Sequence, residues 1–301
     1  MTPEQHQEEA KKGIVLAISA YTMWGIAPIY FKLLGHVSPL EILSHRIIWS
    51  FFLLAGLLHV GRQWKAVVTV FQSKSKLFYL LLTSLLIGGN WLIFIWAINS
   101  NHMLDASLGY YINPLLNVFL GMLFLGERLR KLQWFAVLLA AIGVGIQLVL
   151  FGSIPIVALA LASTFGIYGL LRKKVGVGAQ SGLFIETLVL LPMATLYLFL
   201  LADSPTSSLA VNDWHLNLLL VSAGLVTTLP LLCFTGAATR LKLSTLGFFQ
   251  YIGPSFMFLL AVLVYGEAFS SDKAVTFLFI WGALLVFSFD AAVYNRRRRN
   301  R

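Results

Sequence analysis

Apolar residues occupy most of the chain in runs of about twenty, and short polar or charged segments separate these runs. A run of that length is what an α-helix needs to cross the hydrocarbon core of a bilayer. The pattern predicts ten transmembrane helices, which cover residues 13–34, 40–60, 77–98, 104–125, 132–151, 154–171, 181–201, 215–238, 244–265 and 274–294. The first run is longer than the apolar core of a secretory signal, so we expect it to be retained.

The composition indicates that these helices have lipid around them. Apolar residues make up 58% of the 301 residues and charged residues only 11%, against about 25% charged in soluble domains. Mean hydropathy is +0.83. We therefore expect an all-α integral membrane protein. The single cysteine, Cys233, lies inside an apolar run, so no disulfide framework and no thiolate metal site is expected.

Basic residues predict the direction of each crossing. All but three of the 22 Lys and Arg residues lie in the two tails or in the loops after the second, fourth, sixth and eighth runs; the exceptions are Lys32, Arg46 and Lys273. By the positive-inside rule, both termini are expected in the cytoplasm. Because the net charge of +10 follows the topology in this way, we expect no nucleic-acid partner.

One phrase occurs twice. "YINPLLNVFLGMLFLGE" (111–127) and "YIGPSFMFLLAVLVYGE" (251–267) both begin with Tyr-Ile-x-Pro and end with Gly-Glu, at the same spacing. The copies lie in the fourth and ninth predicted helices, which are five spans apart, and because that offset is odd the copies cross the membrane in opposite directions. The chain is therefore expected to contain two inverted five-helix repeats, residues 13–151 and 154–294, between cytoplasmic tails at 1–12 and 295–301.

Inverted repeats suggest a function. Two similar halves inserted in opposite directions can adopt each other's conformation, which opens a site near the midplane alternately to each side. The leading hypothesis is a secondary transporter that moves a small organic metabolite or an amphipathic drug by alternating access.

The chain also resembles a known family. Two five-helix halves whose fourth helices end in Gly-Glu are similar to the EamA family of the drug/metabolite transporter superfamily. The segments "MWGIAPIYFKL", "EILSHRIIWSFF", "IGGNWLIFIWAIN", "ASLGYYINPLLN" and "LSTLGFFQYIGP" extend the resemblance over nearly the whole chain. The resemblance implies a ten-helix permease of the bacterial inner membrane, and it implies no particular substrate.

The fourth predicted helix has the most polar face. Tyr110, Asn113, Asn117 and Gly121 follow one another at intervals of 3, 4 and 4, so they share one side of the helix. Mid-membrane amides need hydrogen-bond partners because unsatisfied polar groups are costly in hydrocarbon. The amides could line a substrate cavity or join neighbouring helices. We favour the cavity, and we expect Pro114 to kink the helix.

The ninth predicted helix repeats the kink at Pro254 but is less polar. Its candidate contributions to a substrate site are Gln250 and Tyr251. A cavity between the two helices would therefore have hydrogen-bonding groups mainly from the first half and an apolar wall from the second. Such a cavity suits an amphipathic solute.

Two more helices supply candidates. These are Tyr21, Trp24, Pro28 (a kink) and Lys32 (a gate residue) on the first helix, and Asn90 and Trp91 on the third. Aromatic residues at helical spacing usually pack rather than bind ligands. Trp24 and Trp91 gain weight as ligand contacts because they lie mid-span, away from the interfaces where Trp gathers.

Two charges lie inside predicted spans, where each is costly. Arg46 lies about two turns from the outer end of the second helix, and Glu186 lies at a similar depth from the inner end of the seventh. A separation of about 10 Å along the membrane normal argues against a direct ion pair. We hypothesise that Arg46 holds an outer gate or an anionic group of the solute, and that Glu186 serves an inner gate or a proton. The alternative is that both fix helix packing.

Glu127 and Glu267 are expected to be structural, each accepting hydrogen bonds from the N-terminus of the following helix.

A membrane enzyme is disfavoured because the histidines are scattered along the chain. The sequence has no phosphate-binding loop, so we expect no ATP-driven transport, and we expect no cofactor or metal. A lipid or lipid-linked-sugar translocator is the alternative function. The expected partners are a small-molecule substrate and the lipid bilayer, and a homodimer is left open.

Overall fold

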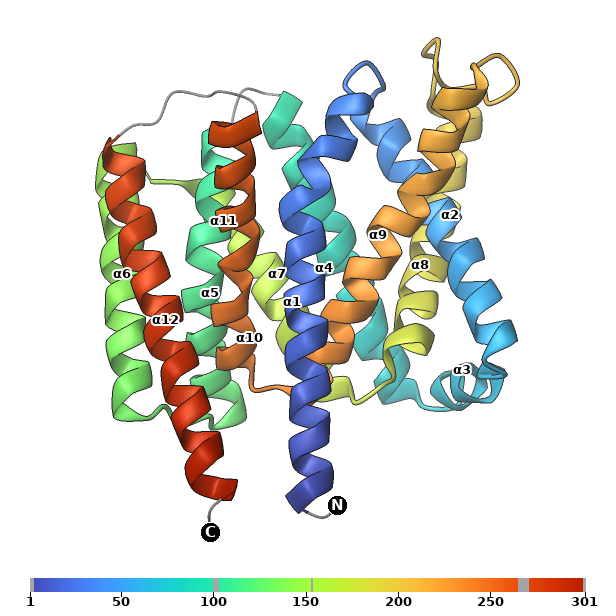
Figure 1. Cartoon of the computed structure of the whole chain (residues 1–301). Coiled ribbons are helices and arrows are strands. Elements are labelled where there is room, and N and C mark those ends of the chain that lie inside the picture. The colour runs from blue at the N-terminus through green and yellow to red at the C-terminus, as the bar shows by residue number, and fades with distance from the viewer. Residues whose placement is uncertain (1–2, 100–102, 153, 265–270, 300–301) are drawn as a thin grey trace.

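The computed structural model describes residues 3–99, 103–152, 154–264 and 271–299, and every regular element among them is a helix (Figure 1). The helices are α1 (Pro3–Leu33), α2 (Pro39–Val60), α3 (Trp64–Phe71), α4 (Lys74–Asn99), α5 (Met103–Leu125), α6 (Lys131–Phe151), α7 (Ile156–Val175), α8 (Ala179–Leu196), α9 (Trp214–Arg240), α10 (Leu243–Gln250), α11 (Ile252–Leu259) and α12 (Ser271–Arg299). Two π-helical segments, η1 (Tyr197–Leu201) and η2 (Leu260–Val264), continue α8 and α11.

Ten of these helical segments are long and apolar enough to cross a membrane, and each coincides with one of the predicted runs. The prediction of an all-α integral membrane protein with ten spanning helices is confirmed. The apolar pattern does not predict α3, which lies between α2 and α4. Its Val67 and Val70 are buried in a cluster with Leu183 and Leu231, and the polar and basic residues around this single short amphipathic helix hide its pattern.

The two halves are inverted copies of each other. In Figure 1, α1 leads away from the end of the molecule where both termini lie, whereas its counterpart α7 leads towards that end. We call this the terminus end. Helices of each repeat pack against the same kind of partner from the other repeat. Helix α1 packs against α9 and α11, and its counterpart α7 packs against their counterparts α4 and α5. Likewise α2 contacts α9, and α8 contacts α4. The predicted pair of inverted five-helix repeats is therefore present.

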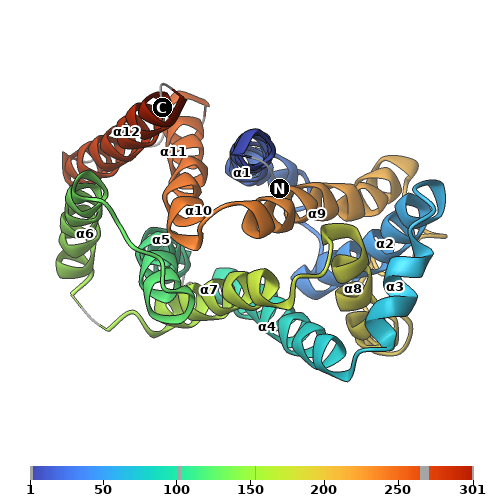
Figure 2. The same cartoon turned by 90° about the horizontal axis from the view of Figure 1, so that it is seen from below.

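The helices surround a shared centre. Helices α6 and α12 pack together at one edge of the molecule, and α2 and α8 pack together at the other (Figure 2). Between these edges lie α1, α4, α5, α7, α9 and the α10–α11 pair. The two repeats thus face each other across the middle of the bundle.

The ninth spanning segment is divided where a proline removes a backbone donor. Pro254 has no N–H to bond to the carbonyl four residues earlier, at Gln250. The α10 helix ends at Gln250 and α11 begins at Ile252, with the intervening Tyr251 N–H donating to Phe248 O in a tighter turn. The break thus lies at Tyr251, three residues before Pro254, where the sequence predicts a kink. Pro28 and Pro114, by contrast, lie inside the continuous helices α1 and α5.

Candidate functional site

A cavity lies between the repeats, near the middle of the bundle. It contains about 1090 Å³ of empty space when the part that is open to solvent is included. Helices α1, α2, α4, α5, α7, α9, α10 and α11 line it. The predicted residues in its wall are Tyr21, Trp24, Pro28, Arg46, Asn90, Trp91, Tyr110, Asn113, Gln250 and Pro254. Most of the predicted substrate-site residues are thus brought together by five separate spans.

Arg46 supplies the charge of this cavity. Its Nε donates a hydrogen bond to Thr227 Oγ1 at 2.8 Å, from α2 to α9. The guanidinium carbon lies 4.8 Å from the ring centre of Trp91 and 5.6 Å from that of Phe31. Both distances are within the range of cation–π attraction. The Arg46 side chain is therefore held by groups from three other helices, α1, α4 and α9.

The amides beside the cavity also join helices. Asn90 Nδ2 donates to Leu161 O at 3.0 Å and to Thr164 Oγ1 at 2.8 Å, which ties α4 to α7. Asn113 Nδ2 donates to Ala162 O at 3.1 Å, which ties α5 to α7. Asn90 and Asn113 reach the cavity wall, but their amide donors join neighbouring helices, which is the alternative role expected from the sequence for asparagines in the membrane.

Asn117 lies outside the cavity, contrary to expectation. It is 1% exposed, and its Nδ2 donates to Asn113 Oδ1 and to Gln250 Oε1, each at 3.0 Å. The residue lies one turn nearer the terminus end than Asn113, where α5 and α10 approach closely: a Cβ on Gly247 would fall 2.9 Å from the Asn117 Cβ. Asn117 therefore bridges the two repeats instead of lining the cavity.

The cavity is closed towards the terminus end by an aromatic floor, which we define as Tyr21, Trp24, Phe165, Tyr168 and Phe234. The Trp24 and Phe165 rings meet edge-to-face at 5.8 Å, Phe165 and Phe234 lie 5.0 Å apart, and Tyr168 stacks on Phe234 at 6.1 Å. Tyr21, Tyr168 and Phe234 are at most 2% exposed.

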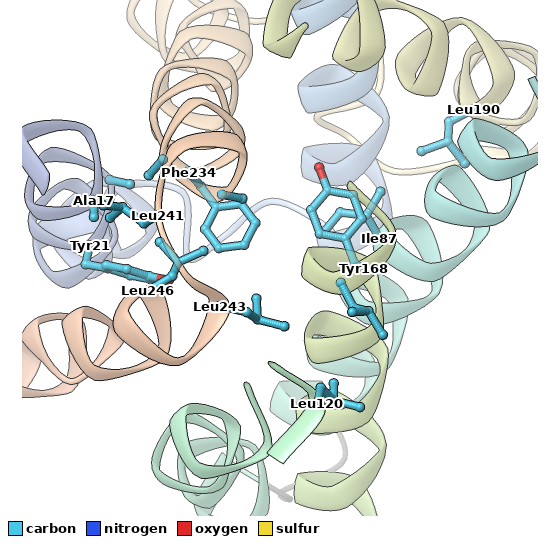
Figure 3. Close-up of a cluster of buried hydrophobic side chains, with 14 of the residues drawn as sticks. Ala17, Tyr21, Ile87, Leu120, Tyr168, Leu190, Phe234, Leu241, Leu243 and Leu246 are labelled. Carbon is cyan, nitrogen blue, oxygen red and sulfur yellow. The ribbon is translucent and has the colours of Figure 1, made fainter. Parts of the chain in front are cut away.

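Apolar side chains continue the closure below the aromatic floor. Leu243 and Leu246 of α10 and Leu120 of α5 belong to the same buried cluster as Tyr168 and Phe234 (Figure 3). Leu243 and Leu246 are fully buried. These packed side chains lie between the cavity and the terminus end.

Glu186 is buried outside the cavity among partners from α4 and α7. It is 2% exposed and accepts hydrogen bonds from Thr83 Oγ1 at 2.6 Å and Tyr168 OH at 3.3 Å, and Arg172 Nε lies 3.7 Å from its Oε1. It lines no part of the cavity. The charge count places Arg172 in a loop, but it belongs to the last turn of α7 and is fully buried. Arg46 and Glu186 thus have separate partners.

Two further candidates lie away from the cavity. Tyr251 is fully buried, packs in a cluster with Phe248 and Phe287, and donates from its OH to Tyr111 O at 3.3 Å. Neighbouring residues point in different directions around a helix, so Gln250 can face the cavity while Tyr251 faces α12. Lys32 is exposed near the end of α1.

Glu127 caps a helix, but not the expected one. Its Oε1 accepts from Leu243 N at 2.6 Å, and its Oε2 accepts from Ser244 N at 3.0 Å and Ser244 Oγ at 2.7 Å. These donors begin α10 in the other repeat, whereas the prediction named the following helix. Gly126 has φ of +63°, a left-handed conformation that ends α5 and turns Glu127 back towards Gly121. Glu267 lies outside the described residues.

Sequence reasoning missed Phe31, Phe165 and Thr227 in the cavity wall. The internal repeat contains a signal for Phe165, because "YTMWG" and "ASTFG" align Trp24 with Phe165. The two counterparts meet in the floor, as expected near a pseudo-twofold axis. Thr227 carries no comparable signal.

Comparisons with known proteins agree over the full chain. Residues 11–149 match the EamA-like transporter family. An uncharacterized transporter of Vibrio cholerae is 76% identical over 290 residues, which cover 96% of this chain and 95% of the relative. The RarD proteins of Salmonella typhimurium and Escherichia coli K12 are 60% and 58% identical, and the alignments cover 97% and 98% of this chain and 99% of each relative. One solved crystal structure shares the fold, with a TM-score of 0.71 at 19% identity over 95% of this chain and 98% of that one.

Proposed function

Because the chain belongs to the EamA-like transporter family, we propose that it carries a small organic solute across the bacterial inner membrane by alternating access. The family and the ten apolar helices make it a multi-pass membrane transporter. The observation that supports the mechanism is a central cavity between inverted repeats, with polar and aromatic walls and one closed end. Substrate sites of inverted-repeat transporters lie at such a position.

The cavity belongs to an outward-open state in this proposal. The positive-inside rule puts the terminus end in the cytoplasm, and the aromatic floor lies between the cavity and that end. Exposure along α1 supports this assignment: Tyr21 in the floor is 2% exposed, whereas Phe31, ten residues further from the terminus end, is partly exposed. Solute therefore enters from the periplasmic side in this conformation.

The inward-open state requires the floor to part and the opposite end to close. Trp24 and Phe165 are counterparts in the two repeats, so exchange of conformations between the repeats moves both. The bond from Glu127 to the start of α10 crosses between repeats at the terminus end and must lengthen in the same step. Ion or solute gradients supply the energy.

Two measurements test this proposal. In a Cys233→Ser background, an impermeant maleimide added outside right-side-out vesicles is expected to label Thr227→Cys and to leave Leu246→Cys unlabelled. Purified protein in proteoliposomes is expected to catalyse saturable counterflow of an organic solute, with Trp24→Ala slowing it and lipid-facing Trp134→Ala leaving it unchanged. Labelling of Leu246→Cys alone, or no saturable flux for any solute class, contradicts the proposal.

One observation favours a lipid or lipid-linked-sugar translocator as the second candidate. An apolar groove runs between α1 and α9, and residues on its rim such as Ile26 and Leu225 are 44% and 47% exposed. Ala27 lines both this groove and the central cavity. The two spaces are thus separated by little more than one face of α1. Bilayer exchange of a fluorescent phospholipid in proteoliposomes, unaffected by Trp24→Ala, would favour this candidate over the first.

A further inference from the structure

We infer that the transported solute is an organic anion with a flat apolar body, and that Arg46 binds its oxyanion group. This inference rests on the proposed function and names the class of solute. The argument begins with charge. Arg46 is the single charged side chain among the described residues that line the cavity.

No described carboxylate neutralises Arg46. Glu41 and Glu186 both have other partners. Glu41, about one turn away on α2, accepts hydrogen bonds from the hydroxyls of Ser204 and Thr206. Glu186 accepts from Thr83 and Tyr168 and lies beside Arg172. A positive charge at membrane depth is costly without an anion, so the cavity as built favours one from the solute.

The guanidinium is oriented for a ligand. Its one hydrogen bond among the described residues runs from Nε to Thr227 Oγ1. The two Nη groups thus keep their donors for a ligand, and the rings of Trp91 and Phe31 flank the charge. Parallel N–H donors of this kind match the two oxygens of a carboxylate or the oxygens of a phosphate ester. Apolar walls around the charge exclude water and strengthen the contact.

The rest of the cavity selects the body of the solute. Rings of Trp24, Phe94 and Phe165 and the thioether of Met257 form flat or adaptable apolar walls. The amide oxygens of Asn113 and Gln250 already accept from Asn117. Without a lining carboxylate among the described residues, an ammonium group has no ionic partner and is repelled by Arg46. Cations and zwitterions are therefore disfavoured.

The experiment compares matched probes with the purified full-length protein. Benzoate and indole-3-acetate, with phenyl phosphate as the phosphate arm, are tested against benzamide, benzylamine and phenylalanine, both for binding by isothermal titration and for counterflow in proteoliposomes. We expect the anions to bind at least about tenfold more tightly than their neutral, cationic and zwitterionic analogues, since a hydrogen-bonded ionic contact has this magnitude. Preference for carboxylate or for phosphate identifies the oxyanion.

Variants separate the role of Arg46 from folding. Arg46→Gln is expected to lose the preference for benzoate over benzamide, while Arg46→Lys keeps part of it as a point charge. Arg130→Gln is the control, because Arg130 pairs with Asp290 at the terminus end, away from the cavity. The elution profile and thermal unfolding of each variant report folding. Equal binding of benzoate and benzamide, an unchanged preference in folded Arg46→Gln, or no anion binding overturns the inference. Counterflow of neutral or cationic solutes alone overturns it while leaving the proposed function intact.

Discussion

The buried pair of Glu186 and Arg172 separates a structural role from a role in proton movement. Glu186→Gln keeps the shape of the side chain and removes its charge. Arg172 is fully buried. None of its three side-chain nitrogens has a hydrogen-bond acceptor among the described residues. Among the residues that the structure describes, Glu186 is the one anion paired with Arg172. Removing one partner of such a pair costs about 3–5 kcal/mol because the other charge stays buried.

We expect about 3 kcal/mol here, at the lower end, because the nitrogen-to-oxygen distance of 3.7 Å is long for an ion pair. Adding Arg172→Met to Glu186→Gln is expected to recover most of that loss, since replacing both charges removes the uncompensated one. Urea or thermal unfolding in matched detergent micelles measures the free energy of unfolding of the two single variants and the double variant. A double variant no more stable than Glu186→Gln would refute the reasoning. A fully stable Glu186→Gln without pH-dependent transport would support a proton role instead.

Three further predictions concern contacts between helices. Glu127→Ala is expected to lower the free energy of unfolding by about 1–2 kcal/mol through loss of the cap on α10, and to increase maleimide labelling of a cysteine at Leu246 from the terminus end; unchanged stability and labelling would argue against the cap. Asn117→Leu is expected to cost about 1 kcal/mol in the same unfolding assay, and a neutral effect would contradict the bridge between the repeats. Gly224→Ala is expected to cost about 1–3 kcal/mol because its Cβ would lie 2.5 Å from the backbone of α2, whereas the control Gly56→Ala, with open space around it, should be tolerated.

Hydropathy and the repeated phrase predict the fold well because they act on whole helices. A span of about twenty apolar residues has one stable arrangement in lipid. The repeated spacing from Pro to Glu also identifies counterpart helices whichever direction each one crosses the membrane. The short helix α3 is missed because eight residues carry too few apolar positions to stand out from the basic loop around them.

Side-chain direction is where sequence reasoning loses accuracy. Asn117 shares a helical face with Asn113, yet α5 leaves the cavity between these residues and Asn117 meets α10. Tyr251 is adjacent to Gln250 but lies at the break in the ninth span and packs towards α12. Arg172 and Glu186 pair because the connection between α7 and α8 is short and brings both side chains inside the bundle. Their separation in sequence gives no sign of this.

The central claim is that the repeats exchange conformations about one cavity, and paired distances along α1 and α7 test it most directly. Spin labels at Lys12 and Lys174 report the terminus end of these two helices, and labels at Lys32 and Ile156 report the opposite end. Distances between the spin labels are measured by double electron–electron resonance in lipid nanodiscs, with and without benzoate. We expect two populations, in which the distance within one pair is long when the distance within the other pair is short. A single fixed distance for each pair, or both pairs lengthening together, would contradict alternating access.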